Sequence, residues 1–433
     1  MNLKMCFCLF AVALAGLPAF AETPVVSHVQ MSQNAESPAV FITYDLDGAD
    51  AIITLDVTTN GVSVGGKALR RVAGAVNRKV ETGTGLKIVW RPDVSCPNDL
   101  LSDRAVAKVS VWTEANPPSY MVVSLDGLKD IAYYENEDSL PDGIGSDVYR
   151  TTKIVMRRIP AKDVVWRMGS SDADGVDAND ETTHYVKLTK DYWMGVFPLT
   201  QGQAASGGWS GNYFKGEFAK LRPADMLYFL ALRDNYDTRG VGTNWPAASA
   251  VDAHAVRSSS IIGKLRDLTD VEFDLPTEAQ WEYACRAGGE PQWYTVGGVE
   301  KDLGVIARYR GNHTDSSATG DPRDGHGTAI VGSYLPNDWG LYDMLGNVYE
   351  ICLDRYDVNY AMPEGTDLAT TVFEDPVGAI FDGTNVKRVQ RGGEFSSEKN
   401  ACRVSRRSSA SEDSRYQWNI GARLVAPIDG WAR

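Results

Sequence analysis

The N-terminal quarter of the chain alternates between apolar and polar positions at the period of β-strands. Four stretches are rich in β-branched and aromatic residues, and turn signals such as Asp47-Gly48 and Asn60-Gly61 separate them. These stretches are residues 40–44, 51–57, 86–90 and 105–112. Short strands at this spacing are typical of an antiparallel β-sandwich of the immunoglobulin or fibronectin type, which we expect over residues 22–125 as a spacer or docking module.

The pattern changes after this region. Residues 126–150 are acidic, include Glu135-Asn136-Glu137-Asp138, and contain glycine and proline, so we interpret them as a linker. A second domain is expected over residues 151–427, followed by a short tail at 428–433.

Helix signals in the second domain are clearest after Pro276. Thr277 can cap a helix, Gln280 completes a capping box, and Gly288-Gly289 would end the helix. Two further helices are predicted over residues 223–233 and 250–266.

Much of the second domain lacks any periodic pattern. Long loops are uncommon in a compact domain unless they are functional or cross-linked, and we expect bound cations to hold these loops in place. The irregular segments are residues 312–327, 337–350, 358–384 and 408–419.

The segment from Gly340 to Glu350 is a candidate cation loop. Ca²⁺ takes six to eight oxygen ligands, from carboxylates and from carbonyls of a bent backbone. Asp343 and Glu350 could supply carboxylates, and Gly346 and Val348 could supply carbonyls. The residues alone leave a second interpretation open, in which the acids of a buried turn pair with arginines.

A second candidate cation loop combines two polar segments. Asn312 and Asp324 could supply side-chain oxygens, and His313 and His326 could supply backbone carbonyls. An ordinary pair of polar turns is the alternative. The histidines form no H-x-x-x-H or H-E-x-x-H spacing, so a local histidine metal site is not supported.

The net charge and the N-terminal sequence indicate which ligands to exclude and where the protein is located. The formal charge of −14 argues against nucleic acid, whose phosphates need a basic face. Residues 1–21 have the pattern of a cleavable signal peptide, with Lys4, an apolar run over residues 5–17 and Ala19-Phe20-Ala21. No later stretch is long enough to span a bilayer. We therefore expect a secreted or periplasmic protein without a membrane span.

Three segments of the second domain resemble one known family. The run from Gly340 to Glu350 resembles its G-L-x-D/N-M-x-G-N-V-x-E signature. The second segment lies upstream, at residues 275–286, and begins Leu275-Pro276-Thr277-Glu278. The third lies downstream and consists of Arg391-Gly392-Gly393-Glu394-Phe395, followed by Cys402-Arg403 and by residues 420–425, Ile420-Gly421-Ala422-Arg423-Leu424-Val425. The family is that of the formylglycine-generating enzymes, also called the sulfatase-modifying factor domain, and the resemblance covers about residues 164–427. It implies an α+β domain with a C-type-lectin-like fold, rich in irregular loops, and Ca²⁺ at both candidate loops.

The resemblance departs from the family pattern at its active site. Active members resemble G-G-S-F-x-C-x-x-x-x-C, and their two cysteines hold Cu⁺. Here Cys402 fits the second cysteine, Ser397 stands where the first would be, and Glu394 replaces the serine. Cu⁺ is soft and prefers thiolates to hydroxyl oxygens, so we do not expect it to bind. Ser397 and Cys402 remain the candidate catalytic residues.

These departures favour one function over another. We expect a non-oxidase, Ca²⁺-stabilised binding module for a protein, peptide or glycan ligand. The alternative is a copper-dependent oxidase that uses Cys402 to convert a substrate cysteine to formylglycine. Five arginines could form salt bridges with the loop acids: Arg391, Arg403, Arg406, Arg407 and Arg423. Alternatively, together with Trp339, Tyr349 and Trp418, they could line a groove for an anionic or extended ligand, and both interpretations remain open.

Overall fold

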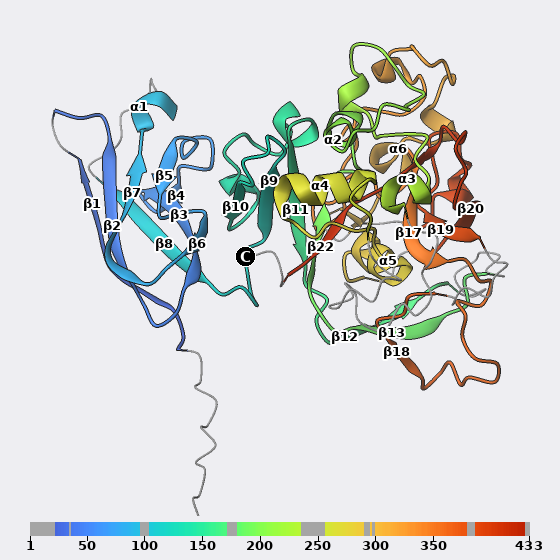
Figure 1. The fold of residues 1–433 in the computed structure, drawn as a ribbon, viewed down its shortest axis with the longest axis horizontal. Coiled ribbons are helices and arrows are strands. Elements are labelled where there is room, and N and C mark those ends of the chain that lie inside the picture. Colours follow the sequence, from blue (N-terminus) through green and yellow to red (C-terminus); the bar gives the residue numbers. More distant parts are fainter. Residues whose placement is uncertain are drawn as a thin grey trace, which may run out of the picture.

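The computed structural model describes residues 22–33, 36–95, 104–170, 180–234, 256–289, 295–296, 299–378 and 386–428. Figure 1 shows a mainly β unit, with one short helix, beside a larger α+β domain. The predicted signal peptide at residues 1–21, part of the helix predicted over 250–266 and most of the tail lie outside the described residues. None of the described helices is long and apolar enough to cross a membrane.

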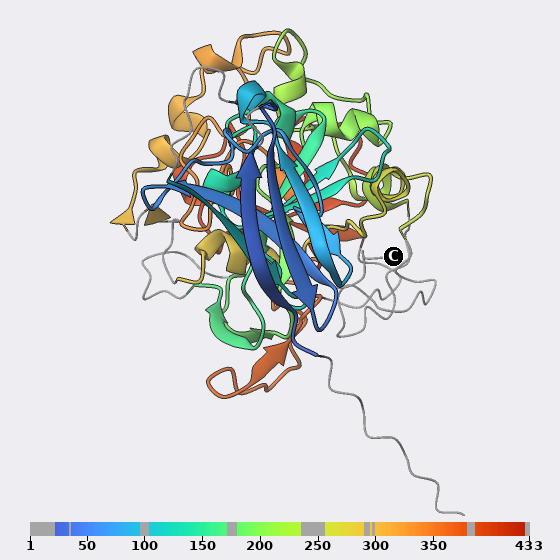
Figure 2. The same cartoon turned by 90° about the vertical axis from the view of Figure 1, so that its left-hand side faces the viewer.

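The N-terminal unit consists of two antiparallel sheets whose residues share one buried apolar cluster (Figure 2). One sheet has the order β1-β2-β7-β5, and in the other β3 pairs with β4, β6 and β8. The bounds are β1 Val25–Gln33, β2 Val40–Asp47, β3 Ala51–Thr59, β4 Val62–Ser63, β5 Val72–Gly74, β6 Arg78–Val80, β7 Gly83–Trp90 and β8 Ala105–Trp112, with the short helix α1 at Pro92–Ser95. The four predicted strand stretches are confirmed.

The periodicity of these strands explains the cluster. Alternate side chains of β2, from Val40 to Leu46, are buried, because successive residues of a strand point to opposite faces. Trp90 at the end of β7 is fully buried, and its Nε1 donates to the carbonyl of Ala68 at 2.8 Å. Trp90 is therefore a core residue.

The segment expected to be an acidic linker differs from that expectation. It contains strand β10, and Tyr133, Leu140 and Tyr149 are buried within it. The amide of Tyr133 donates to the carbonyl of Asn77 in the N-terminal unit at 2.8 Å. Aromatic and aliphatic residues between the acids anchor the segment, so residues 126–150 form a packed junction.

The second domain contains a five-stranded antiparallel sheet with the order β10-β9-β11-β14-β22, which lies next to the N-terminal unit (Figure 1). Its bounds are β9 Tyr120–Ser124, β10 Ile131–Tyr134, β11 Lys153–Ile159, β14 Tyr192–Gly195 and β22 Val425–Pro427. Because β9 pairs with β11, the N-terminal unit ends at β8, earlier than the boundary predicted at residue 125.

The smaller sheets and most of the helices lie farther from the N-terminal unit than this sheet does (Figure 1). Three strands have the order β12-β13-β18, with β18 parallel to β13, and four have the order β20-β19-β17-β21, with β21 parallel to β17. Their bounds are β12 Val164–Met168, β13 His184–Leu188, β17 Tyr349–Arg355, β18 Val372–Glu374, β19 Lys387–Arg391, β20 Arg407–Ser411 and β21 Ile420–Gly421, and a hairpin joins β15 Thr295–Val296 to β16 Val299–Glu300. The helices are α2 Gln201–Ser206, α3 Phe229–Arg233, α4 Ile261–Thr269, α5 Glu278–Arg286 and α6 Leu303–Ile306.

The helix predictions have different outcomes. The capping box of α5 is confirmed, with Thr277 and Gln280 bonded reciprocally. The first predicted helix is shorter than expected and begins only at Phe229, because Pro223 forms an extended bridge with Thr200. Within the described part of the second predicted helix, residues 256–260 are not helical, and α4 begins after its cap Ser260 and continues to Thr269, beyond the predicted end at residue 266. The chain is thus a β-rich α+β protein.

Candidate functional site

Helix α5 positions two buried acids against arginines of the neighbouring sheet. Glu278 and Glu282 lie one turn apart and are both buried. Arg407 of β20 donates from Nε and Nη2 to the Glu278 carboxylate at 2.7 and 2.9 Å, and Arg391 of β19 forms an ion pair with Glu282. These two arginines therefore hold the domain together and are not available to a ligand.

Two more of the predicted arginines are also paired. Arg403 contacts both oxygens of Glu181 at 2.7 Å, and Arg423 contacts Glu350 at 2.7 Å. Arg406 is half-buried, 3.4 Å from an Asp180 oxygen. The salt-bridge interpretation of these arginines is confirmed.

The loop from Gly340 to Glu350 uses its acids internally. One Glu350 oxygen also accepts from Trp281 Nε1 at 2.6 Å, so both oxygens are occupied by protein donors. Asp343 accepts from the amide of Gly332 at 2.6 Å and from Asn347 Nδ2 at 3.3 Å. Burial raises the pKa of Asp343 to about 6. Glu350 therefore follows the alternative left open by the sequence, an acid paired with an arginine.

The remaining predicted ligands of this loop belong to its backbone. Gly346 has φ +70° and donates its amide to the carbonyl of Gly392 at 2.8 Å. A Cβ at Gly346 would lie 2.1 Å from the carbonyl oxygen of Arg308, so only glycine fits this contact. Val348 has a buried side chain. These two residues shape a packed turn.

In the second candidate loop, arginine guanidinium groups donate hydrogen bonds to the backbone carbonyls. Arg222 Nη1 donates to the carbonyls of His326 at 3.0 Å and Thr328 at 2.6 Å, and Nη2 donates to the carbonyl of Gly320 at 2.5 Å. Arg308 donates to the carbonyl of Asn312 at 2.5 Å. Two buried positive side chains thus occupy the region where a cation was expected.

The side chains predicted as ligands in this loop do not converge. The Asn312 side-chain oxygen accepts from the amide of Tyr309 at 2.9 Å, and the Asp324 side chain is exposed. His326 Nδ1 lies 2.8 Å from an Asp315 oxygen, and the His313 ring packs on Phe395 at 5.0 Å. The described residues contain no group of three or more His, Cys, Asp or Glu side chains that could hold a metal. Calcium at either loop stays a prediction that this donor set does not support.

The segment that replaces the two-cysteine site is closed by hydrogen bonds. Ser397 Oγ donates to Glu394 Oε1 at 3.2 Å and accepts from the Glu394 amide at 3.1 Å. Ser396 donates to the same carboxylate through its amide and its hydroxyl, both at 2.8 Å. The hydroxyls of Ser397 and Tyr349 lie 3.5 Å apart. Glu394 therefore organises this turn.

Cys402 lies beneath this turn as a buried free thiol. Burial and the Glu394 charge raise its pKa to about 12, although the amides of Glu394 and Gly346 donate to it. A Cβ at Gly393 would lie 2.6 Å from the Cys402 sulfur, so this glycine gives the thiol its space. One protonated thiol with hydroxyl and carboxylate neighbours does not fit Cu⁺, which needs soft thiolates.

An aromatic cluster lies next to the turn. The Phe395 ring is 5.4 Å from Phe214 and 5.5 Å from Trp418, and Tyr213 is 5.2 Å from Trp418. Phe214 and Phe395 are buried, whereas Tyr213 is 38% exposed. We call Tyr213, Phe214, Phe395, Trp418 and His313 the aromatic cluster; together they offer a rigid apolar surface with polar edges.

Sequence reasoning missed several of these residues. Trp418 was considered as a ligand contact, but Tyr213 and Phe214 are about 200 residues away along the chain and carried no motif. The sequence did not single out Arg222 and Arg308, because they bind backbone carbonyls, and every residue carries a carbonyl whatever its type. Trp339 was expected near a groove, but it packs on Tyr283 at 5.3 Å.

A family model shows the family to which the chain belongs. A family model described as "Sulfatase-modifying factor enzyme 1-like domain" matches residues 158–428. The formylglycine-generating enzyme of Streptomyces coelicolor is 36% identical over 166 residues, which cover 36% of this chain and 47% of that protein. The inactive C-alpha-formylglycine-generating enzyme 2 of Bos taurus is 36% identical over 89 residues, which cover 19% of this chain and 27% of that protein. This chain thus spans less than half the length of either relative.

The chain is also similar to solved structures. The Treponema denticola variable protein 1 is similar with a TM-score of 0.46 at 22% identity, over 64% of this chain and 96% of that chain.

Proposed function

Because this chain belongs to the sulfatase-modifying factor enzyme 1-like domain family, we propose that it is a non-oxidase member whose second domain binds a protein, peptide or glycan ligand. The observation that carries the proposal is the turn over Cys402. Ser397 and Glu394 are hydrogen-bonded to each other where a second thiol would be needed.

The chemistry of the turn opposes metal-dependent oxidation. A thiol must lose its proton to bind Cu⁺ or to act as a nucleophile. Burial of Cys402, and to a smaller extent the neighbouring Glu394 carboxylate, raise the pKa of the thiol and oppose that loss. A relative described as inactive exists in the same family, which supports loss of activity on a retained fold.

We assign ligand binding to the aromatic cluster. Its most accessible members are the exposed Tyr213 and the half-buried Trp418, and Trp418 packs on Phe395 of the turn that carries Ser397. Aromatic side chains bury a large area at a small entropic cost and are enriched at binding sites. The four buried arginines cannot contribute to this ligand-binding surface, because each of them already forms an ion pair with an acid. They are Arg391, Arg403, Arg407 and Arg423.

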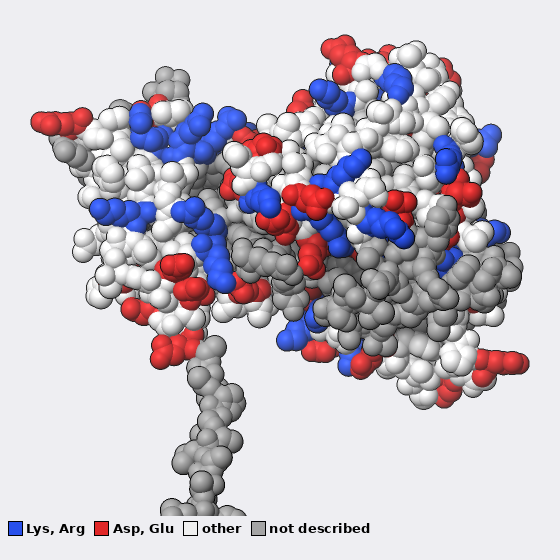
Figure 3. Space-filling model, in the orientation of Figure 1, with Lys and Arg blue, Asp and Glu red and all other residues white. Residues whose placement is uncertain are grey.

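The remaining parts of the proposal concern the N-terminal unit and export. We propose that the two N-terminal sheets form a sandwich of the immunoglobulin or fibronectin type that supports the second domain. Export to the periplasm or the exterior is proposed from the signal pattern of residues 1–21. Acidic and basic side chains are interspersed over the second domain on the face in Figure 3, which offers no uniformly basic surface there for nucleic acid.

A turnover assay tests the choice between binding module and oxidase. The protein is incubated with Cu⁺, O₂ and a peptide containing Cys-x-Pro-x-Arg, and formylglycine is measured by mass spectrometry. We expect no product and no Cu⁺ binding. The double variant Glu394→Ser with Ser397→Cys should bind Cu⁺, because it restores the second thiol and removes the carboxylate.

Control variants distinguish a positive from a negative result of the turnover assay. Product from the unmodified protein that disappears in Cys402→Ser would establish the oxidase alternative. If no product forms, peptide and glycan arrays follow, with Trp418→Ala as the variant that should lose binding. Phe41→Ala, an exposed aromatic residue in the N-terminal unit, serves as the matched control.

A further inference from the structure

The loop between α2 and the 3₁₀ turn at Ala219–Leu221 carries two members of the aromatic cluster, Tyr213 and Phe214. Phe214 is fully buried, whereas Tyr213 is 38% exposed. Their ring centroids lie 5.1 Å apart with an interplanar angle of 88°, so the buried ring supports the exposed one edge to face. The position of Tyr213 at the surface therefore depends on how this loop is held.

Asp225 holds the backbone of the loop from inside the domain. It is fully buried, and its carboxylate accepts from the amide of Tyr213 and, at 3.3 Å, from the amide of Phe214. Gln201 of α2 is also buried, and its Nε2 donates to Asp225 Oδ2 at 3.2 Å and to the carbonyl of Phe214 at 3.0 Å. Buried backbone groups need such partners, so these two side chains replace the partners that a helix or strand would supply.

The loop in turn holds the backbone of Asp225. The Asn212 side-chain oxygen accepts from the amide of Asp225 at 3.1 Å and from Trp209 Nε1 at 3.2 Å. Trp209 Nε1 also donates to the carbonyl of Asp225 at 3.3 Å. Because the contacts run in both directions, the loss of either partner leaves buried polar groups unsatisfied.

The buried carboxylate of Asp225 is explained by the loop that it binds. Burial of a carboxylate is unfavourable unless hydrogen bonds compensate, and an apolar side chain would fill the same space at a lower cost. Burial raises the pKa of Asp225 to about 7, while the amides of Tyr213 and Phe214 and the charges of Lys215 and Arg222 oppose the rise. The hydrogen bonds to the loop are thus what this residue contributes beyond packing.

We propose that Asp225 is a positioning residue of the ligand surface: together with Gln201 it fixes the loop so that Tyr213 already lies in place before a ligand binds. This inference rests on the proposed function, because it takes the aromatic cluster as the ligand surface. A side chain that is held in its bound position loses less conformational freedom on binding, which raises affinity. Asp225 and Gln201 act through Tyr213 and do not touch the ligand, because both are buried.

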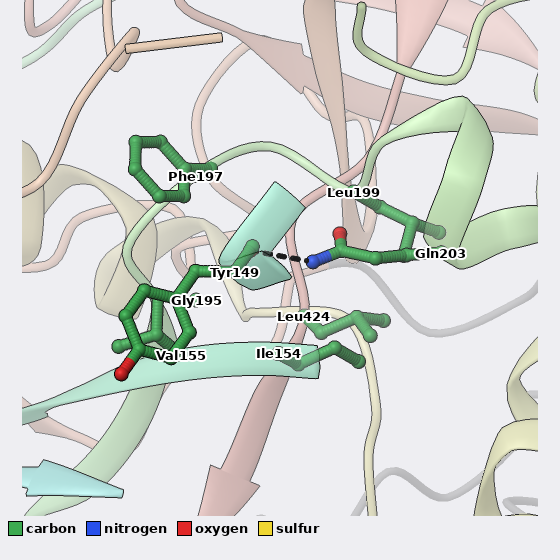
Figure 4. Close-up of a pocket in the computed structure, with 8 residues that line it drawn as sticks. All are labelled: Tyr149, Ile154, Val155, Gly195, Phe197, Leu199, Gln203 and Leu424. Atoms are coloured by element: carbon green, nitrogen blue, oxygen red, sulfur yellow. Dashed lines mark hydrogen bonds between the residues drawn. The ribbon is translucent and has the colours of Figure 1, made fainter. Parts of the chain in front are cut away.

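Gln203 provides a matched control on the same helix. Like Gln201 it is a buried glutamine whose Nε2 donates to two acceptors, the carbonyls of Tyr149 at 3.0 Å and Lys153 at 2.8 Å. Figure 4 shows the first of these bonds, in a gap lined mainly by apolar side chains. Its oxygen accepts from the Thr200 amide at 3.1 Å, so its hydrogen bonds do not reach residues 209–214. Gln203→Ala therefore removes at least as many hydrogen bonds as Gln201→Ala without releasing the loop.

Nuclear magnetic resonance of protein labelled with ¹⁵N-tyrosine tests the hydrogen bond to Asp225 without any ligand. The amide signal of Tyr213 is identified by its disappearance in Tyr213→Phe. In the unmodified protein this amide proton should shift downfield as the pH rises through about 7, because an ionised carboxylate accepts a shorter and stronger hydrogen bond. The shift should be lost in Asp225→Asn, which cannot ionise. An equal shift in Asp225→Asn would overturn the assignment of Asp225.

The ¹⁹F signal of Trp418 in protein labelled with 5-fluorotryptophan tests the surface itself. Trp418→Phe identifies the signal, and the Tyr213 ring lies 5.2 Å from this indole. Asp225→Ala and the milder Gln201→Ala should shift or broaden the signal, because Tyr213 is no longer fixed against the indole. Gln203→Ala should leave the signal unchanged even where it lowers the melting temperature more. This difference separates positioning from a general loss of stability.

The outcomes for positioning and for ligand binding are distinguishable. An unchanged Trp418 signal in folded Gln201→Ala, or an equal change in Gln203→Ala, would overturn the positioning role whatever the peptide and glycan arrays show. The array peptide or glycan that Trp418→Ala no longer binds should bind Gln201→Ala about tenfold more weakly than Gln203→Ala, and equal affinities would also overturn the role. Arrays that yield no binder, with both resonance signals behaving as expected, would contradict the proposed function and leave Asp225 as the residue that fixes the loop.

Discussion

The N-terminal unit and the second domain are stabilised in different ways. The cluster shared by the N-terminal sheets is apolar, with Ile42, Ile88 and Trp90 fully buried. Beside the apolar core of the second domain, Arg391 and Glu282 are also fully buried and face each other. The first arrangement needs only the right alternation along each strand. The second needs particular partners that lie far apart in the sequence.

The largest expected effect comes from breaking a buried ion pair. Arg391→Met leaves the Glu282 carboxylate buried with one fewer positive partner, which should lower the free energy of unfolding by about 3–5 kcal/mol. Urea unfolding followed by tryptophan fluorescence measures this loss.

A surface pair of the N-terminal unit provides the control. Arg91 and Asp93 form an ion pair at 2.8 Å but are solvent-exposed, so water and salt screen their attraction and Arg91→Met should change the unfolding free energy far less than Arg391→Met does. Equal effects of the two substitutions would contradict the distinction between the two regions.

Acid should unfold the second domain through Glu181. Burial opposes its ionisation, but hydrogen bonds from Arg403, Ser170 and Ser405 outweigh burial and hold the pKa at about 2. A lowered folded-state pKa gives stability that is present above the unfolded value of 4.5 and is lost as pH falls towards 2. The loss should be about 3 kcal/mol in order of magnitude.

Chemical unfolding at a series of pH values checks this sign. Glu181→Gln should be less stable at neutral pH. Its free energy of unfolding should also fall less steeply than that of the unmodified protein as the pH is lowered from 4.5 towards 2. If the variant lost as much unfolding free energy at acid pH as the unmodified protein, Glu181 would not control the acid unfolding.

A smaller effect is expected in the apolar cluster. Ile88→Val removes one methyl group from a fully buried position, which should cost about 0.5–1.5 kcal/mol. The junction bonds the unit to the second domain, through Tyr133 to Asn77 and Gly66 to Asp138, so both parts should unfold in one transition. Calorimetry showing two separate transitions, with only the first moved by Ile88→Val, would contradict this coupling.

This contrast also explains what could be predicted from the sequence. The N-terminal strands and the α5 capping box depend on residues close in the chain, and both were predicted correctly. The pairing of Glu350 with Arg423 joins residues 73 positions apart, so sequence could only offer it as an alternative. The junction was mistaken for a linker because its acids outnumber the aromatic residues that anchor it.

The smallest expected effect concerns calcium and the loop around Asn312. Arg222 and Arg308 already donate to the carbonyls of this loop, so removal of divalent cations should shift the melting temperature by about 1 °C or less. Differential scanning calorimetry with and without EDTA measures the shift, and Arg222→Met serves as the positive control that should lower it clearly. A large drop with EDTA that added Ca²⁺ reverses would restore the calcium prediction, because only a bound ion makes stability depend on its free concentration. If EDTA leaves the melting temperature unchanged while Arg222→Met lowers it, the guanidinium groups bind the loop carbonyls in place of a cation.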